Sequence, residues 1–155
     1  ASSTLSLPIG AGRMTREFLT GDPYTGKSIK ALTQFSREQI SQSVSGELLL
    51  HQADRIVATS KTFRTLARLT DHWYSDSAKT LEHSALVAAI EKLKDLSNSQ
   101  RAALPGVSAS RAKQLLAGAI VAEAVMSHLK IDEVEICPWA LREGIVLKWL
   151  DWMEK

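Results

Sequence analysis

The sequence predicts an α/β fold, in which a small sheet of three to four strands is flanked by helices. Three short apolar runs have the composition of strands, and the segments between them repeat apolar residues every three to five positions, as helices do. The expected strands are Thr4–Ile9, Arg55–Thr59 and Glu133–Cys137. The expected order of elements is βααβαααβα.

In the first half of the chain, glycine and proline mark the ends of the elements. A glycine-containing turn at 10–12 follows the first expected strand, and Gly21-Asp22-Pro23 separates the first two helices. The apolar run Arg55–Thr59 is typical of a buried strand in a parallel sheet and leads directly into a helix. The expected helices are Arg13–Phe18, a longer one from about Lys27 to Leu48, and Lys61–Leu69, with a polar connection at Asp71–Lys79.

The second half is expected to be more helical. Ser97 and Ser108 each precede a helical pattern and are candidate N-caps. The long helix from Ser108 to Leu129 carries small residues on several sides, so we expect it to be largely buried. The other expected helices are Ser84–Leu96, a short one after Ser97, and a closing one after Pro138.

Composition limits the classes of protein without identifying one. At 155 residues and 45% hydrophobic positions, the chain can bury one core, so we expect a single domain over residues 1–155. A net charge of +2 is too small to indicate nucleic acid. Residues 1–70 hold nine Lys and Arg against five Asp and Glu, which makes the first half the expected side for an anionic ligand. One cysteine, Cys137, fits a reducing cytoplasm, and neither a signal peptide nor a membrane span is expected.

Three motifs follow one another in a fixed order. They are Ser6–Thr15 (SLPIGAGRMT), Leu104–Ala112 (LPGVSASRA) and Ile136–Gly144 (ICPWALREG). Together they resemble the exopolyphosphatase / guanosine pentaphosphate phosphohydrolase (Ppx/GppA phosphatase) family. The resemblance covers almost the whole chain, but it corresponds to the back part of such an enzyme.

The resemblance implies a ribonuclease-H-like domain of the actin-like ATPase and sugar-kinase superfamily, with the first strand of that domain missing from this chain. It implies that the chain is the C-terminal part of a two-domain, cytoplasmic phosphatase that acts with its N-terminal domain. The implied activity is release of terminal orthophosphate from polyphosphate, and guanosine pentaphosphate is a possible second substrate. A homodimer is also expected, because a missing strand leaves a sheet edge free to pair.

The same resemblance implies that this chain holds no catalytic residue. Members of the family carry an Asp-x-Gly-Gly-Gly-Ser phosphate loop and a catalytic glutamate, and neither occurs in this sequence. Phosphoanhydride hydrolysis also needs Mg²⁺ or equivalent dipoles, and the ligands of the implied Mg²⁺ are not expected in this chain. The isolated chain is therefore expected to be inactive.

The first candidate phosphate-binding segment is the turn that holds Gly10, Ala11 and Arg13. Backbone N–H groups beside a cation at a helix start can bind phosphate, although such a turn is more often only a turn. In the family this segment continues from the phosphate-binding part of the cleft. Arg13 has an alternative role, because Glu17 lies four residues on and can pair with it.

The second candidate segment is Ser60-Lys61, where a strand runs into a helix N-terminus. From the residues alone, Ser60 is more simply the cap of that helix. In the superfamily this place carries a glycine-rich turn that faces a nucleotide. The departure to Ser-Lys would crowd a nucleoside and add a cation, which favours polyphosphate over a guanosine nucleotide.

Arg111 is the strongest single candidate. It lies in the first turn of the long helix, where a cation works against the helix dipole and gains nothing locally. In the family the matching arginine meets phosphate oxygens. The alternative is an ion pair with a neighbouring carboxylate. Arg142, in the last motif, is expected to be structural.

Two classes of function remain open. One is the C-terminal domain of an exopolyphosphatase-like hydrolase, whose substrate would touch Gly10, Ala11, Arg13, Ser60, Lys61 and Arg111. The other is a non-catalytic module that binds an anion or a partner protein.

Overall fold

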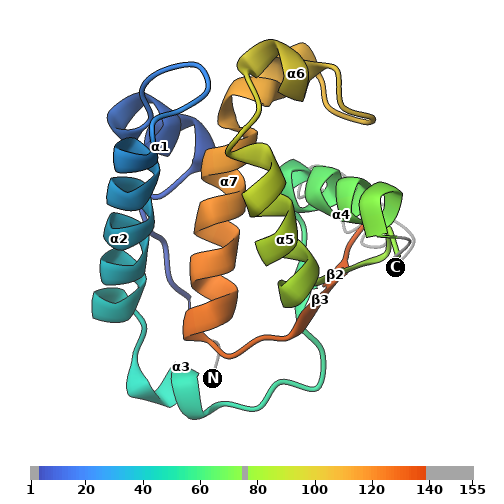
Figure 1. Cartoon of the computed structure of the whole chain (residues 1–155). Helices are drawn as coiled ribbons and strands as arrows, with labels where there is room; N and C mark the ends of the chain where they lie inside the picture. The colour runs from blue at the N-terminus through green and yellow to red at the C-terminus, as the bar shows by residue number, and fades with distance from the viewer. Residues whose placement is uncertain (1–3, 75–76, 139–155) are drawn as a thin grey trace, which may run out of the picture.

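The computed structural model describes residues 4–74 and 77–138 of the chain. Its helices surround one long central helix, and a three-stranded sheet lies at one side (Figure 1). The elements are α1 (Ala11–Phe18), α2 (Gly26–Ser43), α3 (Gly46–Leu50), β1 (Val57–Ala58), α4 (Lys61–Tyr74), β2 (Thr80–Glu82), α5 (His83–Leu93), α6 (Asn98–Ala102), α7 (Ala109–His128) and β3 (Glu133–Ile136).

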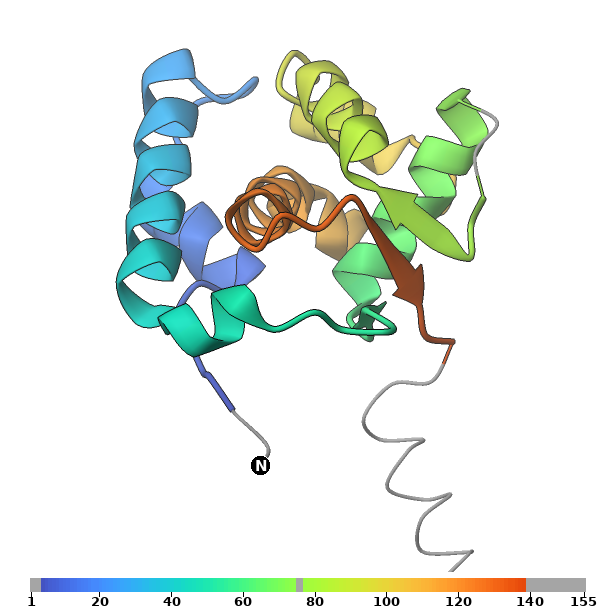
Figure 2. The same cartoon turned by 90° about the horizontal axis from the view of Figure 1, so that it is seen from below.

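Helix α7 is the centre of the molecule. It packs against α1, α2, α4, α5 and α6, and the view along its axis shows it enclosed by the other helices (Figure 2). Its buried positions are mostly small or aliphatic, and the run Leu115–Ile120 is buried at every residue. The prediction of a largely buried helix from Ser108 to Leu129 is therefore confirmed. Ser108 occupies the N-cap position, but its hydroxyl contacts Ser110 Oγ instead of a backbone N–H.

One acidic residue lies within this central helix. Glu123 is 9% exposed, and burial of a carboxylate is costly unless it is paired. Its Oε1 lies 3.2 Å from His83 Nε2, and its Oε2 lies 3.6 Å from a guanidinium nitrogen of Arg37. This cluster joins α7 to α2 and to the start of α5.

The sheet has the order β1-β3-β2. β1 runs parallel to β3, with Ala58 opposite Ile136, whereas β2 is antiparallel to β3, with Leu81 opposite Val134. Two of the three predicted strands are thus present in shorter form. β2 was not predicted, because a three-residue strand that leads straight into a helix has no room for an alternating pattern.

The predicted strand Thr4–Ile9 is wrong. No residue from 4 to 9 pairs in the sheet of the described chain, although Ile9 is buried in the core. A strand requires a partner for its backbone hydrogen bonds, and Pro8 has no N–H to donate. The apolar alternation reflects packing of an extended segment onto the helices rather than membership of the sheet.

Two helix boundaries also differ from the prediction. The helix expected to reach Leu48 ends at Ser43, and Ser45 caps the separate helix α3 through a bond from Leu48 N. Helix α4 continues to Tyr74, through residues expected to be a connection, since Trp73 and Tyr74 both contact the Lys92 ammonium on α5. The short helix capped by Ser97 is confirmed, with a full capping box. The predicted closing helix after Pro138, and Arg142 within it, lie outside the described residues.

None of the helices in the described part of the chain is long and apolar enough to cross a membrane.

Gly118, in the middle of α7, allows two other helices to approach closely. A Cβ atom at this position would lie 2.5 Å from Thr62 Cγ2 on α4 and 3.2 Å from Ala11 Cβ on α1. The contact with Thr62 is too short to form without displacement, and the contact with Ala11 is tighter than most real Cβ contacts. The absence of a side chain at Gly118 therefore sets the distances from α7 to the N-terminal turns of α1 and α4.

Gly118→Ala is expected to destabilise the protein by about 1–3 kcal/mol, because the added methyl overpacks the helix crossing. This is the opposite of the gain of about 1 kcal/mol that alanine brings to an open helix position. The free energy of unfolding, measured by urea denaturation, tests the prediction.

The matched control is Gly118→Ala combined with Thr62→Ser, which removes the methyl group that the new Cβ would meet. The double variant should recover most of the lost stability. Equal destabilisation in the single and double variants would show that Thr62 is not the obstacle.

Candidate basic pocket

The N-terminal turns of α1 and α4 converge on the same stretch of α7. Ala11, the first residue of α1, and Thr62, the second residue of α4, both lie against Gly118. Each turn leaves backbone N–H groups without partners inside its own helix, and both helix dipoles point their positive ends here. The segments that the sequence singled out, 10–13 and 60–61, are thus brought together although they lie far apart in the chain.

A pocket of about 250 Å³ lies beside this convergence. It is formed by one face of α4, by the connection between α6 and α7, and by the first turn of α7. The residues that line it are Lys61, Arg64, Thr65, Arg68, Gly106 and Arg111. Four of these six carry a positive charge at neutral pH, and none carries a negative one.

Three of these cations come from a single helix face. Lys61, Arg64 and Arg68 are spaced three and four residues apart, so their side chains project from the same side of α4. Gly106, whose φ of 77° suits a residue without a side chain, turns the chain so that the start of α7 faces them. Arg111 then completes the pocket from the other side.

These cations lack counter-charges within the described residues. No carboxylate of residues 4–74 and 77–138 forms an ion pair with Lys61, Arg64, Arg68 or Arg111. The Nε atom of Arg64 is buried and has no hydrogen-bond partner there. Like charges held together repel each other, and a buried donor without an acceptor is costly. An anion in this pocket would relieve both penalties.

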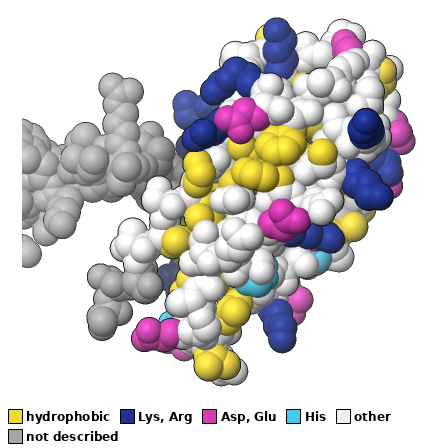
Figure 3. Space-filling view, turned by 90° about the vertical axis from the view of Figure 1, so that its left-hand side faces the viewer, with side chains coloured by type: hydrophobic (Ala, Val, Ile, Leu, Met, Phe, Trp, Pro, Cys, Tyr) yellow, Lys and Arg dark blue, Asp and Glu magenta, His cyan; other side chains and the backbone are white. Residues whose placement is uncertain are grey.

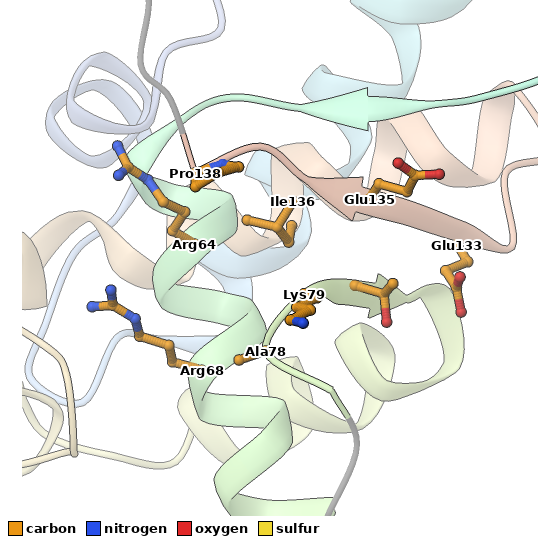
Figure 4. Close-up of a pocket in the computed structure, with 9 residues that line it drawn as sticks. Arg64, Arg68, Ala78, Lys79, Glu133, Glu135, Ile136 and Pro138 are labelled. Carbon is orange, nitrogen blue, oxygen red and sulfur yellow. The ribbon is translucent and has the colours of Figure 1, made fainter. Parts of the chain in front are cut away.

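A larger cavity of about 710 Å³ adjoins the basic pocket and shares Arg64 and Arg68 with it. In Figure 4 the two arginines extend from successive turns of α4, while Glu133 and Glu135 project from β3 on the opposite side. The α4 side of the cavity is therefore cationic and the β3 side, called the acidic wall, carries two carboxylates, while Lys79 lies between them.

The acidic wall carries an ion pair of its own. Arg55 Nε lies 3.2 Å from Glu135 Oε2, and the guanidinium also donates through Nη2. The hydrogen bonds from Arg55 lower the pKa of the Glu135 carboxyl below its usual value of 4.5 and, reciprocally, raise the pKa of Arg55. The charge of Glu135 is thus compensated by Arg55, and Glu135 does not neutralise the cations of the basic pocket.

Comparison with known proteins identifies the family. The sequence model of the Ppx/GppA phosphatase family matches residues 1–153. The chain belongs to the Ppx/GppA phosphatase family. It is 46% identical over 151 residues to Exopolyphosphatase 1 of Mycobacterium bovis and 44% identical over 151 residues to Exopolyphosphatase 1 of Mycobacterium leprae. Each alignment covers 95% of this chain but only 44% of the relative.

Solved structures of the Ppx/GppA family have the same fold. One crystal structure of the Aquifex aeolicus Ppx/GppA phosphatase superposes with a TM-score of 0.80 at 26% identity, over 95% of this chain and 49% of that one. A second, at 24% identity, gives a TM-score of 0.83. The predicted ribonuclease-H-like, actin-like ATPase class is therefore confirmed, and this chain represents about half of such a structure.

Two of the six residues predicted for the Ppx/GppA site, Lys61 and Arg111, line the basic pocket. Gly10 is the N-cap of α1 and Ala11 its first residue, beside α7. Ser60 Oγ accepts a hydrogen bond of 3.2 Å from Phe63 N, so Ser60 caps α4 as the alternative interpretation held. Arg13 Nε donates to Glu17 Oε1 at 2.8 Å, which is the pairing that their spacing allowed.

Arg64 and Arg68 were not singled out from the sequence. The sequence does contain the pattern that could have indicated them, since Lys61, Arg64 and Arg68 form one basic stripe on a predicted helix. What the sequence did not provide was the element opposite them. A basic stripe is usually a solvated helix face, and only the position of the α6–α7 connection turns it into a pocket.

The resemblance to Ppx/GppA enzymes implies Mg²⁺, and the described residues do not fit it. Among them, no group of three or more His, Cys, Asp or Glu is placed to hold a metal ion. The basic pocket is also unsuited to a cation, because all its charged residues are positive.

Because Arg55 lowers the pKa of Glu135, the ionised pair stabilises the folded state above the pKa of the unfolded chain. This contribution is expected to disappear as the pH falls from the usual 4.5 through the lowered folded-state pKa of Glu135. Glu135→Gln should therefore lower the Tm at pH 7, and the difference from the native protein should vanish once the pH is below that lowered pKa. Thermal melts of both proteins across this range test it. A difference that is the same at every pH would contradict it.

Proposed function

We propose that this chain forms the phosphate-binding wall of an exopolyphosphatase-like hydrolase, which releases terminal orthophosphate from inorganic polyphosphate. The observation that carries the proposal is the basic pocket, where four cations meet without a counter-charge from the described residues. Membership of the Ppx/GppA family and similarity to proteins named Exopolyphosphatase 1 support the reaction. The chain spans less than half the length of those relatives, so the activity belongs to the proposal for the whole protein.

The cations suit a chain of phosphates better than a single anion. Arg64 and Arg68 lie four residues apart on α4, which separates their origins by about 6 Å along the helix axis. Guanidinium groups bind phosphate oxygens through two parallel hydrogen bonds, and Lys61 adds a point charge at the N-terminus of α4. The backbone N–H groups at the start of α1, at Gly10 and Ala11, have no partner within that helix and would bind further phosphates of the same chain.

In this proposal the chain's residues bind and orient the substrate, and none of them acts as the catalytic base. Arg111 and Arg64 hold oxygens of the phosphate chain, and in doing so they stabilise the negative charge that develops on the leaving group. When bound, Mg²⁺ would supply further charge stabilisation, from ligands other than the described residues. The base that orients the attacking water lies elsewhere in the protein, and cytoplasmic location is part of the proposal.

Guanosine pentaphosphate is the second substrate to test. The adjoining cavity of about 710 Å³ has the size of a small-molecule site, and its acidic wall could accept hydrogen bonds from a base. Lys61 at the start of α4 favours polyphosphate instead, because it adds a positive charge to the basic pocket and does not line the larger cavity. We therefore propose inorganic polyphosphate as the preferred substrate.

A binding module without catalysis is the second candidate function. The side of the molecule that carries α2 shows a band of hydrophobic side chains bordered by charged side chains of both signs (Figure 3). Among the large apolar residues, Leu50 is 85% exposed and Val57, on the edge strand β1, is 47% exposed. Exposed apolar groups of this kind mark contact surfaces, here for the remainder of the same protein or for a second copy.

Arg111→Ala in the full-length protein tests the proposed substrate contact. Loss of a charge-assisted hydrogen bond, worth about 1.5–3 kcal/mol, should lower kcat/KM for polyphosphate roughly 10- to 150-fold. The Tm should stay nearly unchanged, because Arg111 contributes little to the core. Lys30→Ala, on the exposed face of α2, is the matched control and should leave both quantities unchanged. Equal effects of the two variants on kcat/KM would exclude the basic pocket as the substrate site.

The isolated 155-residue chain is expected to bind inorganic tripolyphosphate without hydrolysing it, because its residues supply the binding wall but no base. Release of orthophosphate, measured with and without Mg²⁺ against a heat-treated sample, tests this. Turnover above that blank would show that one of these residues acts as the base. Failure to bind tripolyphosphate would favour the interaction module.

A further inference from the structure

Arg101, on the short helix α6, is completely buried. A guanidinium group stays charged at any physiological pH, so its burial requires strong compensation. No carboxylate of the described residues pairs with it. Its Nη2 atom is buried without a hydrogen-bond partner among them. Such a residue needs a reason beyond packing, because an apolar side chain would fill the same space without the desolvation cost.

The partners of Arg101 are backbone carbonyls from two segments. Nη1 donates to Leu96 O, just before α6, and Nε donates to Ala112 O in the first turn of α7, at 3.3 Å. The planar fork of the guanidinium holds the two carbonyls in a fixed relation. Arg101 therefore fastens the start of α6 to the start of α7, which lie side by side at one end of the molecule (Figure 1).

A third segment of the chain packs against the Arg101 guanidinium. The Tyr24 ring, in the connection between α1 and α2, lies 4.5 Å from the Arg101 guanidinium carbon. Its hydroxyl donates to Lys113 O at 2.6 Å. Two successive carbonyls of α7, at 112 and 113, are thus held by side chains from two other parts of the chain.

These contacts lie next to two segments that line the basic pocket. Arg111 immediately precedes the two restrained residues, and Gly106 lies in the connection between α6 and α7 that Arg101 spans. Arg101 does not line the pocket. One of its acceptors, Ala112 O, belongs to the residue that directly follows Arg111, so the effect of Arg101 on that pocket passes through the backbone.

We infer that Arg101 is a positioning residue, which fixes the first turn of α7 so that the Arg111 guanidinium points into the basic pocket before an anion arrives. The inference rests on the proposed function, since it assigns Arg101 a role at the same phosphate-binding site. A pre-positioned arginine loses less conformational freedom on binding than a mobile one, and this difference appears as affinity.

The test is a double-mutant cycle in the full-length protein, with inorganic tripolyphosphate as the probe and titration calorimetry as the measurement. Arg101→Met should weaken binding about five- to tenfold, the size of coupling expected between neighbouring residues. In the Arg111→Ala background, Arg101→Met should have no further effect. Each variant is first melted, so that affinities are compared at a temperature at which all of them are folded.

Arg101→Lys is the second variant, and it decides the outcome if Arg101→Met does not fold. It keeps the charge but loses the planar fork, so it should weaken binding nearly as much as Arg101→Met. Native affinity in Arg101→Lys, or additive losses in the cycle, would overturn the positioning role. If Arg111→Ala itself does not weaken tripolyphosphate binding, the proposed function fails instead, because the site on which both depend is then not the binding site.

Discussion

The close approach of α1 and α4 to α7 at Gly118 determines where the basic side chains of the molecule lie. Because Gly118 has no side chain, α1 and α4 can both bring their N-terminal turns against α7. Two sets of unsatisfied backbone N–H groups and two positive dipole ends then meet over one surface. The position of α4 in turn sets where Lys61, Arg64 and Arg68 project. Packing of small residues in the core thus determines the electrostatics of the surface.

The basic pocket lowers the stability of the folded chain, because like charges repel one another. Four cations lie around one small cavity, and neither the described carboxylates nor the Arg55–Glu135 pair on the neighbouring wall neutralises them. Repulsion among the cations of such a site costs folding free energy, which the remainder of the fold must offset. A ligand of opposite charge removes this repulsion when it binds. The same arrangement explains why loss of Arg111 should lower activity without lowering the Tm: removing one of several repelling charges does not weaken the folded state.

The sequence was sufficient to predict features that depend on local pattern. It was not sufficient to predict features that depend on which segment of the chain packs opposite. The burial of α7 followed from its small residues, and the fold class followed from the motifs and their order. The segment Thr4–Ile9 has the pattern of a strand, but a strand also needs a neighbour, and the described chain offers it none. Likewise, the stripe of Arg64 and Arg68 was visible in the sequence. Its meaning depended on the α6–α7 connection, which comes much later in the chain, after Ala102.

Three arginines show how the partner rather than the residue type decides the role. Arg13 is exposed and its Nε is bonded to Glu17, so part of its hydrogen-bonding capacity is already used. Arg101 is buried and uses its fork on two backbone carbonyls, which makes it a structural clamp. Arg111 has neither a described carboxylate nor a described carbonyl as partner, and it faces three other cations. Because no described residue accepts a hydrogen bond from its guanidinium, Arg111 gains more from an incoming phosphate than Arg13 or Arg101. Its position next to the residue clamped by Arg101 links stability at one end of α7 to recognition in the pocket.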